Sequence, residues 1–93
     1  MGDPSARVRL NALIEAGERR DPSSLPGIEA RLKDCEMNVR TKACLALGRI
    51  GSDRAMSLLD KAVRNDPSWY VRDYAYAALG RIRPEARLVR ISQ

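Results

Sequence analysis

Apolar residues recur along this chain at the spacing of an α-helix. Between positions 39 and 50 they stand at intervals of four, four and three, and the same intervals return between 71 and 82. Such a stripe lies on one face of a helix with 3.6 residues per turn. The intervening segments carry a second, shorter stripe of this kind: Leu25, Ile28 and Leu32 in one, and Met56, Leu59 and Val63 in the other. The pattern predicts an all-α chain in which two kinds of helix alternate.

The longer stripes belong to a repeated sequence. VRTKACLALGRI at 39–50 and VRDYAYAALGRI at 71–82 are identical at eight of twelve positions. A more divergent copy begins at Val8, so that the Val-Arg dipeptides stand 31 and 32 positions apart. Each valine has an aspartate five positions before it, an alanine four after it and a glycine nine after it. A period of this length is typical of stacked helical hairpins.

The repeat divides the chain into units. We expect a single domain, residues 1–93, made of three units at 3–33, 34–65 and 66–93, of which the last is truncated. Each complete unit contributes a first helix on the Val-Arg stripe and a second helix after it. The sequence thus predicts about five helices, followed by a C-terminal stub that carries Leu88 and Ile91.

Helix ends are also indicated by particular residues. We expect Gly48 and Gly80 to end the first helices, because glycine adopts the left-handed conformation of a helix end without strain. Asp66 before Pro67, like Asp3 before Pro4, predicts a capping carboxylate followed by proline at the first helical position. A second helix is expected to begin at Ser24, with Pro26 in its first turn.

The pattern of aspartate, Val-Arg, alanine and Ala-Leu-Gly-x-Ile, followed by a second amphipathic helix, resembles the HEAT-like repeats of the phycobilisome lyase type. The resemblance is strongest over 34–82, weaker over 3–33, and fades after Pro84. It implies a short right-handed α-solenoid of HEAT-like helical hairpins. Glu15 and Arg19 depart from it, since later copies carry alanine and isoleucine there, as a solvent-facing terminal unit would. Proteins with similar repeats include bilin lyase subunits, deoxyhypusine hydroxylase and partner-binding scaffolds, so the resemblance leaves the activity open.

Composition excludes several kinds of chemistry. The chain has no histidine, which excludes a histidine base, a Ser-His or Cys-His nucleophile pair and a histidine-ligated metal. Deoxyhypusine hydroxylases, according to the resemblance, hold a di-iron centre with His-Glu pairs, and this chain has none. We therefore assign no catalytic, cofactor-binding or metal-ligating residue, and we expect no cofactor and no catalysis by this chain alone.

Localisation follows from the cysteines and from hydropathy. Cys35 and Cys44 match neither a disulfide framework nor a zinc spacing, which favours a reducing compartment. No apolar stretch is long enough to cross a bilayer. We expect a cytoplasmic protein that does not associate with membranes.

Two groups of residues are candidates for partner binding. The 17 lysines and arginines outnumber the 12 aspartates and glutamates, which favours a partner with an acidic surface. The second helices would form a basic groove if they line a concave face, as the resemblance implies; the alternative is a solvated face without a ligand. Aromatic residues, which are enriched in interfaces, gather near the start of the first helix of the third unit; the alternative is that the C-terminal tail folds back over this face. The candidates are Arg31, Lys33, Lys61, Arg64, Arg87 and Arg90 in the basic group, and Trp69, Tyr70 and Tyr74 in the aromatic group.

These observations favour a non-catalytic HEAT-like scaffold that mediates protein–protein interaction, either as a homo-oligomer or by docking on another protein. One alternative, a subunit of a bilin lyase or isomerase, rests on the resemblance alone. Another is the binding of nucleic acid or another anionic partner through the basic second helices. Nucleic acid is disfavoured, because no aromatic residue stands among these cations to stack on bases. We further expect Arg9, Arg40 and Arg72 to form a ladder of contacts between units.

Overall fold

The computed structural model describes residues 5–82, a stretch that is helical apart from short turns and contains no β-strand. The elements follow each other as α1 (Ala6–Arg19), the 3₁₀ turn η1 (Pro22–Ser24), α2 (Leu25–Arg31), α3 (Met37–Ile50), α4 (Asp53–Asn65) and α5 (Trp69–Ile82). The expected short helical solenoid is confirmed. The expected C-terminal stub lies outside the described residues.

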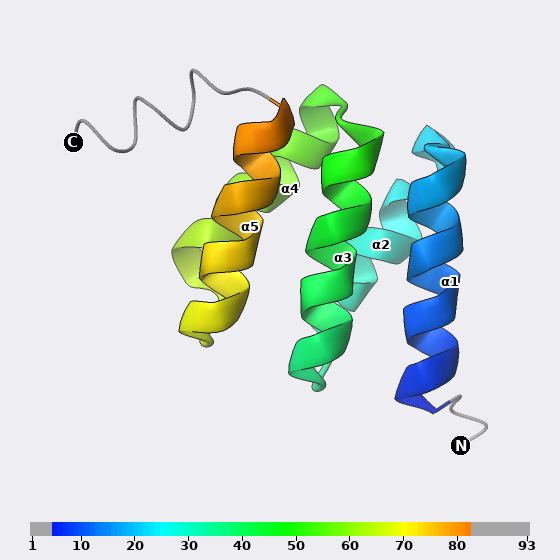
Figure 1. Ribbon diagram of the computed structural model, residues 1–93, viewed down its shortest axis with the longest axis horizontal. Helices are drawn as coiled ribbons and strands as arrows, with labels where there is room; N and C mark the ends of the chain where they lie inside the picture. The colour runs from blue at the N-terminus through cyan, green and yellow to red at the C-terminus, as the bar shows by residue number, and fades with distance from the viewer. Residues whose placement is uncertain (1–4, 83–93) are drawn as a thin grey trace.

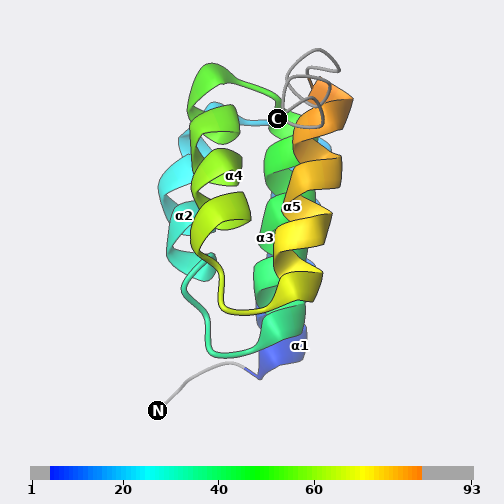
Figure 2. The ribbon, with the colours of Figure 1, turned by 90° about the vertical axis from the view of Figure 1, so that its left-hand side faces the viewer.

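The helices form two layers. The first helices α1, α3 and α5 lie side by side, with α3 in the middle (Figure 1). The second helices α2 and α4 form the other layer, as Figure 2 shows, where α2 packs on α3 and α4 packs on both α3 and α5. Within the described part of the chain, no helix is both long and apolar enough to span a membrane.

The core lies between the layers and along the Val-Arg stripe. Val39, Ala43 and Leu47 of α3 are fully buried, and Val71 and Ala75 repeat the arrangement in α5. Burying one such valine or leucine side chain stabilises a fold by about 1.5–3 kcal/mol. The second layer contributes to the same core its own buried residues: Ile28, Ala55, Leu58, Leu59 and Ala62. The apolar stripe predicted from the sequence therefore forms the hydrophobic core that packs the units together.

The glycines of the repeat do not end the helices, so that expectation was wrong. Gly48 lies inside α3, which continues to Ile50 and ends at Gly51, a residue in the left-handed conformation with φ of 69°. A methyl group on Gly48 would lie 3.2 Å from the Cβ of Ala78 in α5. The same relation holds one unit earlier, where a methyl group on Gly17 would lie 3.1 Å from a backbone atom of α3. These glycines allow neighbouring first helices to approach closely. Gly80 likewise lies inside α5.

The aspartate before the proline also acts differently from our prediction. α5 begins at Trp69, so Pro67 precedes the helix instead of occupying its first position. The carboxylate of Asp66 accepts a hydrogen bond from the backbone N–H of Ser68, at 2.9 Å, and so closes the turn before the helix. Pro26 falls in the first turn of α2, as expected, but that helix begins at Leu25 and is preceded by η1. Asp3 and Pro4 lie outside the described residues.

Candidate functional site

Arginine–aspartate pairs join successive units along one edge of the molecule. Arg9 of α1 donates from Nε to Oδ2 of Asp34 at 2.7 Å and from Nη2 to Oδ1 at 3.2 Å. Arg40 of α3 makes the same two bonds to Asp66, at 3.0 and 3.4 Å. The two aspartate side chains are only 3% and 5% exposed. A planar guanidinium matches a carboxylate in this two-bond geometry, so the expected ladder is confirmed for these two rungs.

The guanidinium groups of Arg40 and Arg72 also contact the turns before their own helices. Nη1 of Arg40 donates to the backbone carbonyl oxygen of Asp34 at 2.9 Å. Nη1 of Arg72 donates in the same way to the carbonyl oxygen of Asp66 at 2.7 Å. Arg40 therefore connects two successive turns, one through a carbonyl group and the next through a carboxylate.

The carboxylate of Asp34 is held in its ionised form. Burial raises the pKa of this carboxyl, but the hydrogen bond from the N–H of Glu36 and the guanidinium of Arg9 lower it more, with a further contribution from Arg31. The pKa of Asp34 consequently lies below its ordinary value of 3.8. Since its oxygens are occupied by these donors, Asp34 serves the structure and is not available to act on a substrate.

The basic group predicted from the sequence is partly neutralised. Arg31 pairs with Asp34 at 3.0 Å, and Arg64 pairs with Asp60 at 3.2 Å. Arg87 and Arg90 lie outside the described residues. The group therefore reduces, in the part of the chain that the structure describes, to two exposed lysines on α4 and after α2, Lys61 and Lys33.

These two lysines border an open groove of about 400 Å³ between α2 and α4. The groove has apolar walls, to which Leu32, Leu58, Ala62 and Pro67 contribute. At one side, Arg54 of α4 pairs with Glu29 of α2 at 3.1 Å and links the two second helices. Sequence reasoning missed this pair, because neither residue belongs to the repeated sequence motifs. That the lysines bind an acidic partner stays a prediction.

The aromatic group lies together at the start of α5. Trp69 and Tyr70 are 69% and 43% exposed, whereas Tyr74 is half-buried and packs against the core. The rings of Trp69 and Tyr70 meet edge to face with centroids 6.0 Å apart, and the centroids of Tyr70 and Tyr74 are 6.4 Å apart. The structure thus brings the three side chains together. Their role in partner binding is untested and stays a prediction.

Residues 5–82 hold no group of three or more cysteine, aspartate or glutamate side chains arranged to bind a metal ion. The two cysteines are not bonded to each other: Cys35 is exposed and Cys44 is buried. Burial raises the pKa of the Cys44 thiol to about 12, and the nearby charge of Asp66 raises it further.

A family model of HEAT repeats matches residues 1–87. The chain belongs to the HEAT-repeat family. The match agrees with the two-layer arrangement of helix pairs described above, and it confirms the HEAT part of the resemblance seen in the sequence.

This HEAT-repeat protein is also similar to three curated proteins. It is 33% identical over 85 residues to deoxyhypusine hydroxylase-B of Oryza sativa subsp. japonica, which covers 89% of this chain and 28% of the relative. It is 33% identical over 82 residues to deoxyhypusine hydroxylase of Arabidopsis thaliana, covering 86% and 26%. The corresponding enzyme of Phaeosphaeria nodorum is 36% identical over 81 residues, covering 84% and 24%. The chain thus spans about a quarter of the length of these relatives.

These relatives overturn the expectation of a non-catalytic scaffold. All three are named as hydroxylases, so the repeat sequence of this chain is shared with enzymes. Their names support neither of the two alternatives, a bilin lyase subunit and a binder of nucleic acid or another anionic partner. The sequence-based interpretation was wrong because it judged activity from this chain's own side chains, and these do not reveal which longer proteins use the same repeats.

Proposed function

We propose that this HEAT-repeat chain takes part in the hydroxylation of deoxyhypusine, as a repeat segment of an enzyme similar to the three relatives. The observation that carries the proposal is the 33–36% identity to deoxyhypusine hydroxylases over at least 84% of the chain. The fold supports it as well, because the described residues form stacked helix pairs and the chain belongs to the HEAT-repeat family.

The residues of this chain do not fit the di-iron centre that the resemblance implies. The sequence has no histidine, and the described residues contain no suitable metal-binding group. The buried carboxylates of Asp34 and Asp66 already bind arginines. The contribution of this segment to the enzyme is therefore the helical frame and its surfaces, while the side chains that carry out the oxidation belong to another segment or subunit.

Deletion of the coding sequence in the native host tests the proposal. The amount of hydroxylated deoxyhypusine would be followed by mass spectrometry, as the gain of one oxygen atom. We expect this product to be lost on deletion and restored by the wild-type chain or by Glu18→Gln, a change at an exposed residue. Restoration should fail with the double variant Asp34→Asn and Asp66→Asn, because it weakens both rungs of the ladder. An unchanged amount of product in the deletion strain, or a host without deoxyhypusine, would overturn the proposal.

We also propose a repeat subtype and a cellular location for this chain. The repeated words Val-Arg and Ala-Leu-Gly-Arg-Ile support a placement among HEAT-like repeats of the phycobilisome lyase type, which concerns the repeat sequence and not an action on bilins. The two unpaired cysteines support a cytoplasmic location, where thiols stay reduced. Fluorescence microscopy of the tagged chain in its host checks the location, and a signal confined to the cell envelope would contradict it.

A further inference from the structure

The groove between α2 and α4 combines apolar walls with a positively charged rim. Its volume of about 400 Å³ lies within the range of about 300–1,000 Å³ that is common for binding pockets. Leu32 is half-buried and Pro67 is exposed, so both present apolar surface to the groove, while Leu58 and Ala62 form a buried floor. All of the lining residues fall between 29 and 67, so the groove is independent of the units at either end of the stack.

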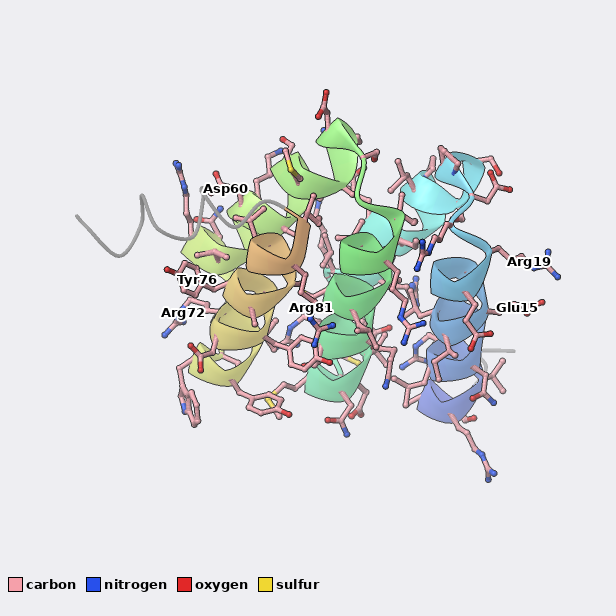
Figure 3. All side chains as sticks on the ribbon, turned by 45° about the horizontal axis from the view of Figure 1, so that its top comes forward. Glu15, Arg19, Asp60, Arg72, Tyr76 and Arg81 are labelled. Carbon is pink, nitrogen blue, oxygen red and sulfur yellow. The ribbon has the colours of Figure 1, made fainter. Side chains whose placement is uncertain are left out.

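The positive charge of the rim comes from Lys33, which follows α2, and from Lys61 of α4, and both are exposed. The three carboxylates that line the groove each bind an arginine: Glu29 pairs with Arg54 at 3.1 Å, Asp34 with Arg9 at 2.7 Å and Asp66 with Arg40 at 3.0 Å. Asp60, which precedes Lys61, pairs with Arg64 and lies on the side of α4 away from α2 (Figure 3). Among residues 5–82, no carboxylate pairs with either lysine, so the rim carries two positive charges that its neighbours do not neutralise.

A protein segment with an apolar residue between acidic ones complements both features of the groove. Its apolar side chain leaves water against Leu32 and Pro67, and its carboxylates meet the two lysines, because opposite charges on facing surfaces attract. Asn65, exposed on the same wall as Lys61, carries an amide that can donate to a peptide carbonyl group or accept from a peptide N–H. Nucleic acid fits less well, since none of the described lining residues is an aromatic on which a base could stack.

We propose that the groove between α2 and α4 binds an acidic segment of a partner protein. An apolar side chain of the segment lies against Leu32 and Pro67, and carboxylates on either side of it pair with Lys33 and Lys61. The inference concerns this groove alone and does not rest on the proposed role in hydroxylation.

Titration of the whole chain with a synthetic peptide tests the inference. The probe is fluorescently labelled Glu-Asp-Leu-Glu-Asp with both ends blocked, and binding is followed by fluorescence anisotropy at low ionic strength. We expect Lys33→Gln and Lys61→Gln each to weaken binding about threefold, because each removes one exposed ion pair. Lys42→Gln is the matched control: it removes the same charge from α3, outside the groove, and should change the affinity little.

A second peptide, with serine in place of leucine, separates the apolar contact from the charge. It should bind at least about fivefold more weakly, because less apolar surface leaves water. Single-stranded oligothymidylate of the same charge should also bind more weakly than the leucine peptide. Amide chemical shifts of the isotope-labelled chain locate the bound peptide, and we expect the largest changes at residues 29–33 and 58–67.

Four results would overturn the inference. One is an equal loss of affinity with all three lysine substitutions, since attraction to the net charge would then explain the binding. Another is equal or tighter binding of the serine peptide or of oligothymidylate. The third is a set of shift changes concentrated on the first helices, and the fourth is no detectable binding of the leucine peptide at millimolar concentration.

Discussion

The carboxylate of Asp34 receives hydrogen bonds from the side chains of two arginines and from one backbone N–H, and its side chain is 3% exposed. Because its pKa lies below the ordinary value of 3.8, the folded chain holds fewer protons than the unfolded chain near that pH. The stability that Asp34 contributes is therefore fully present above pH 3.8 and is lost as the pH falls through the lowered pKa.

Asp34→Asn tests this dependence. At pH 7 we expect the substitution to lower the free energy of unfolding by about 2 kcal/mol, because hydrogen bonds to a charged acceptor are replaced by weaker ones. The difference from the wild type should narrow as the pH falls below 3.8. Urea unfolding followed by circular dichroism at a series of pH values measures it. A difference that stays constant down to pH 2.5 would contradict this account.

The two thiols should react very differently. Cys35 is exposed, whereas Cys44 is fully buried and its pKa is raised to about 12. Since the thiolate is the reactive form, iodoacetamide at pH 8 should modify Cys35 in the native chain and reach Cys44 only after unfolding in urea. Peptide mapping by mass spectrometry locates the modified residue. Comparable rates at both positions under native conditions would show that the core opens around α3.

At the scale of helices, sequence reasoning found the elements but misjudged the ends of α3 and α5 and the starts of α2 and α5. The spacing of Val39, Ala43 and Leu47 was sufficient to predict α3, because burial of one face determines this periodicity. The role of Gly48 was not readable, since a glycine near the end of a helix serves equally as a stop or as a point of close contact. Which of the two roles applies depends on whether another helix packs against the glycine, and here Ala78 of α5 does. The pair between Arg54 and Glu29 was hidden for the same reason, because it joins elements whose side-by-side placement only the fold reveals.

Substitution of two glycines distinguishes close contact from conformational freedom. Gly48→Ala should destabilise the chain by about 1–3 kcal/mol, because the new methyl group would lie 3.2 Å from the Cβ of Ala78. Gly27→Ala in α2 is the matched control: a methyl group there meets nothing within 4 Å, and alanine favours the helix by up to about 1 kcal/mol. Urea unfolding measures both variants. Stabilisation by Gly48→Ala would show that α3 and α5 separate easily.

At the scale of the whole molecule, arginines that occupy the same position of the repeat contribute unequally to stability, because their hydrogen bonds differ. Arg40→Gln removes bonds to the turns at Asp34 and Asp66, including both bonds to a carboxylate. Among residues 5–82, Arg72→Gln removes one bond, to a carbonyl oxygen. In the 93-residue chain we expect Arg40→Gln to cost about 1–2 kcal/mol more than Arg72→Gln. Thermal unfolding of the two variants side by side measures the difference, and equal losses would contradict the ladder as a source of stability.

The turns at Asp34 and Asp66 lie at the same edge of the molecule, at the bottom of Figure 1, whereas the turns around Arg20 and Gly51 lie at the opposite edge. The guanidinium of Arg40 fixes the distance between successive units at the first edge with a nearly buried pair, whereas the pair between Arg54, in the first turn of α4, and Glu29 is largely exposed. Natural variation in length should therefore accumulate beyond α1 and α3, where added residues leave the rungs undisturbed. The spacing of the units is therefore set at the edge that carries the arginine–aspartate pairs, and the turns at the opposite edge can lengthen without changing it.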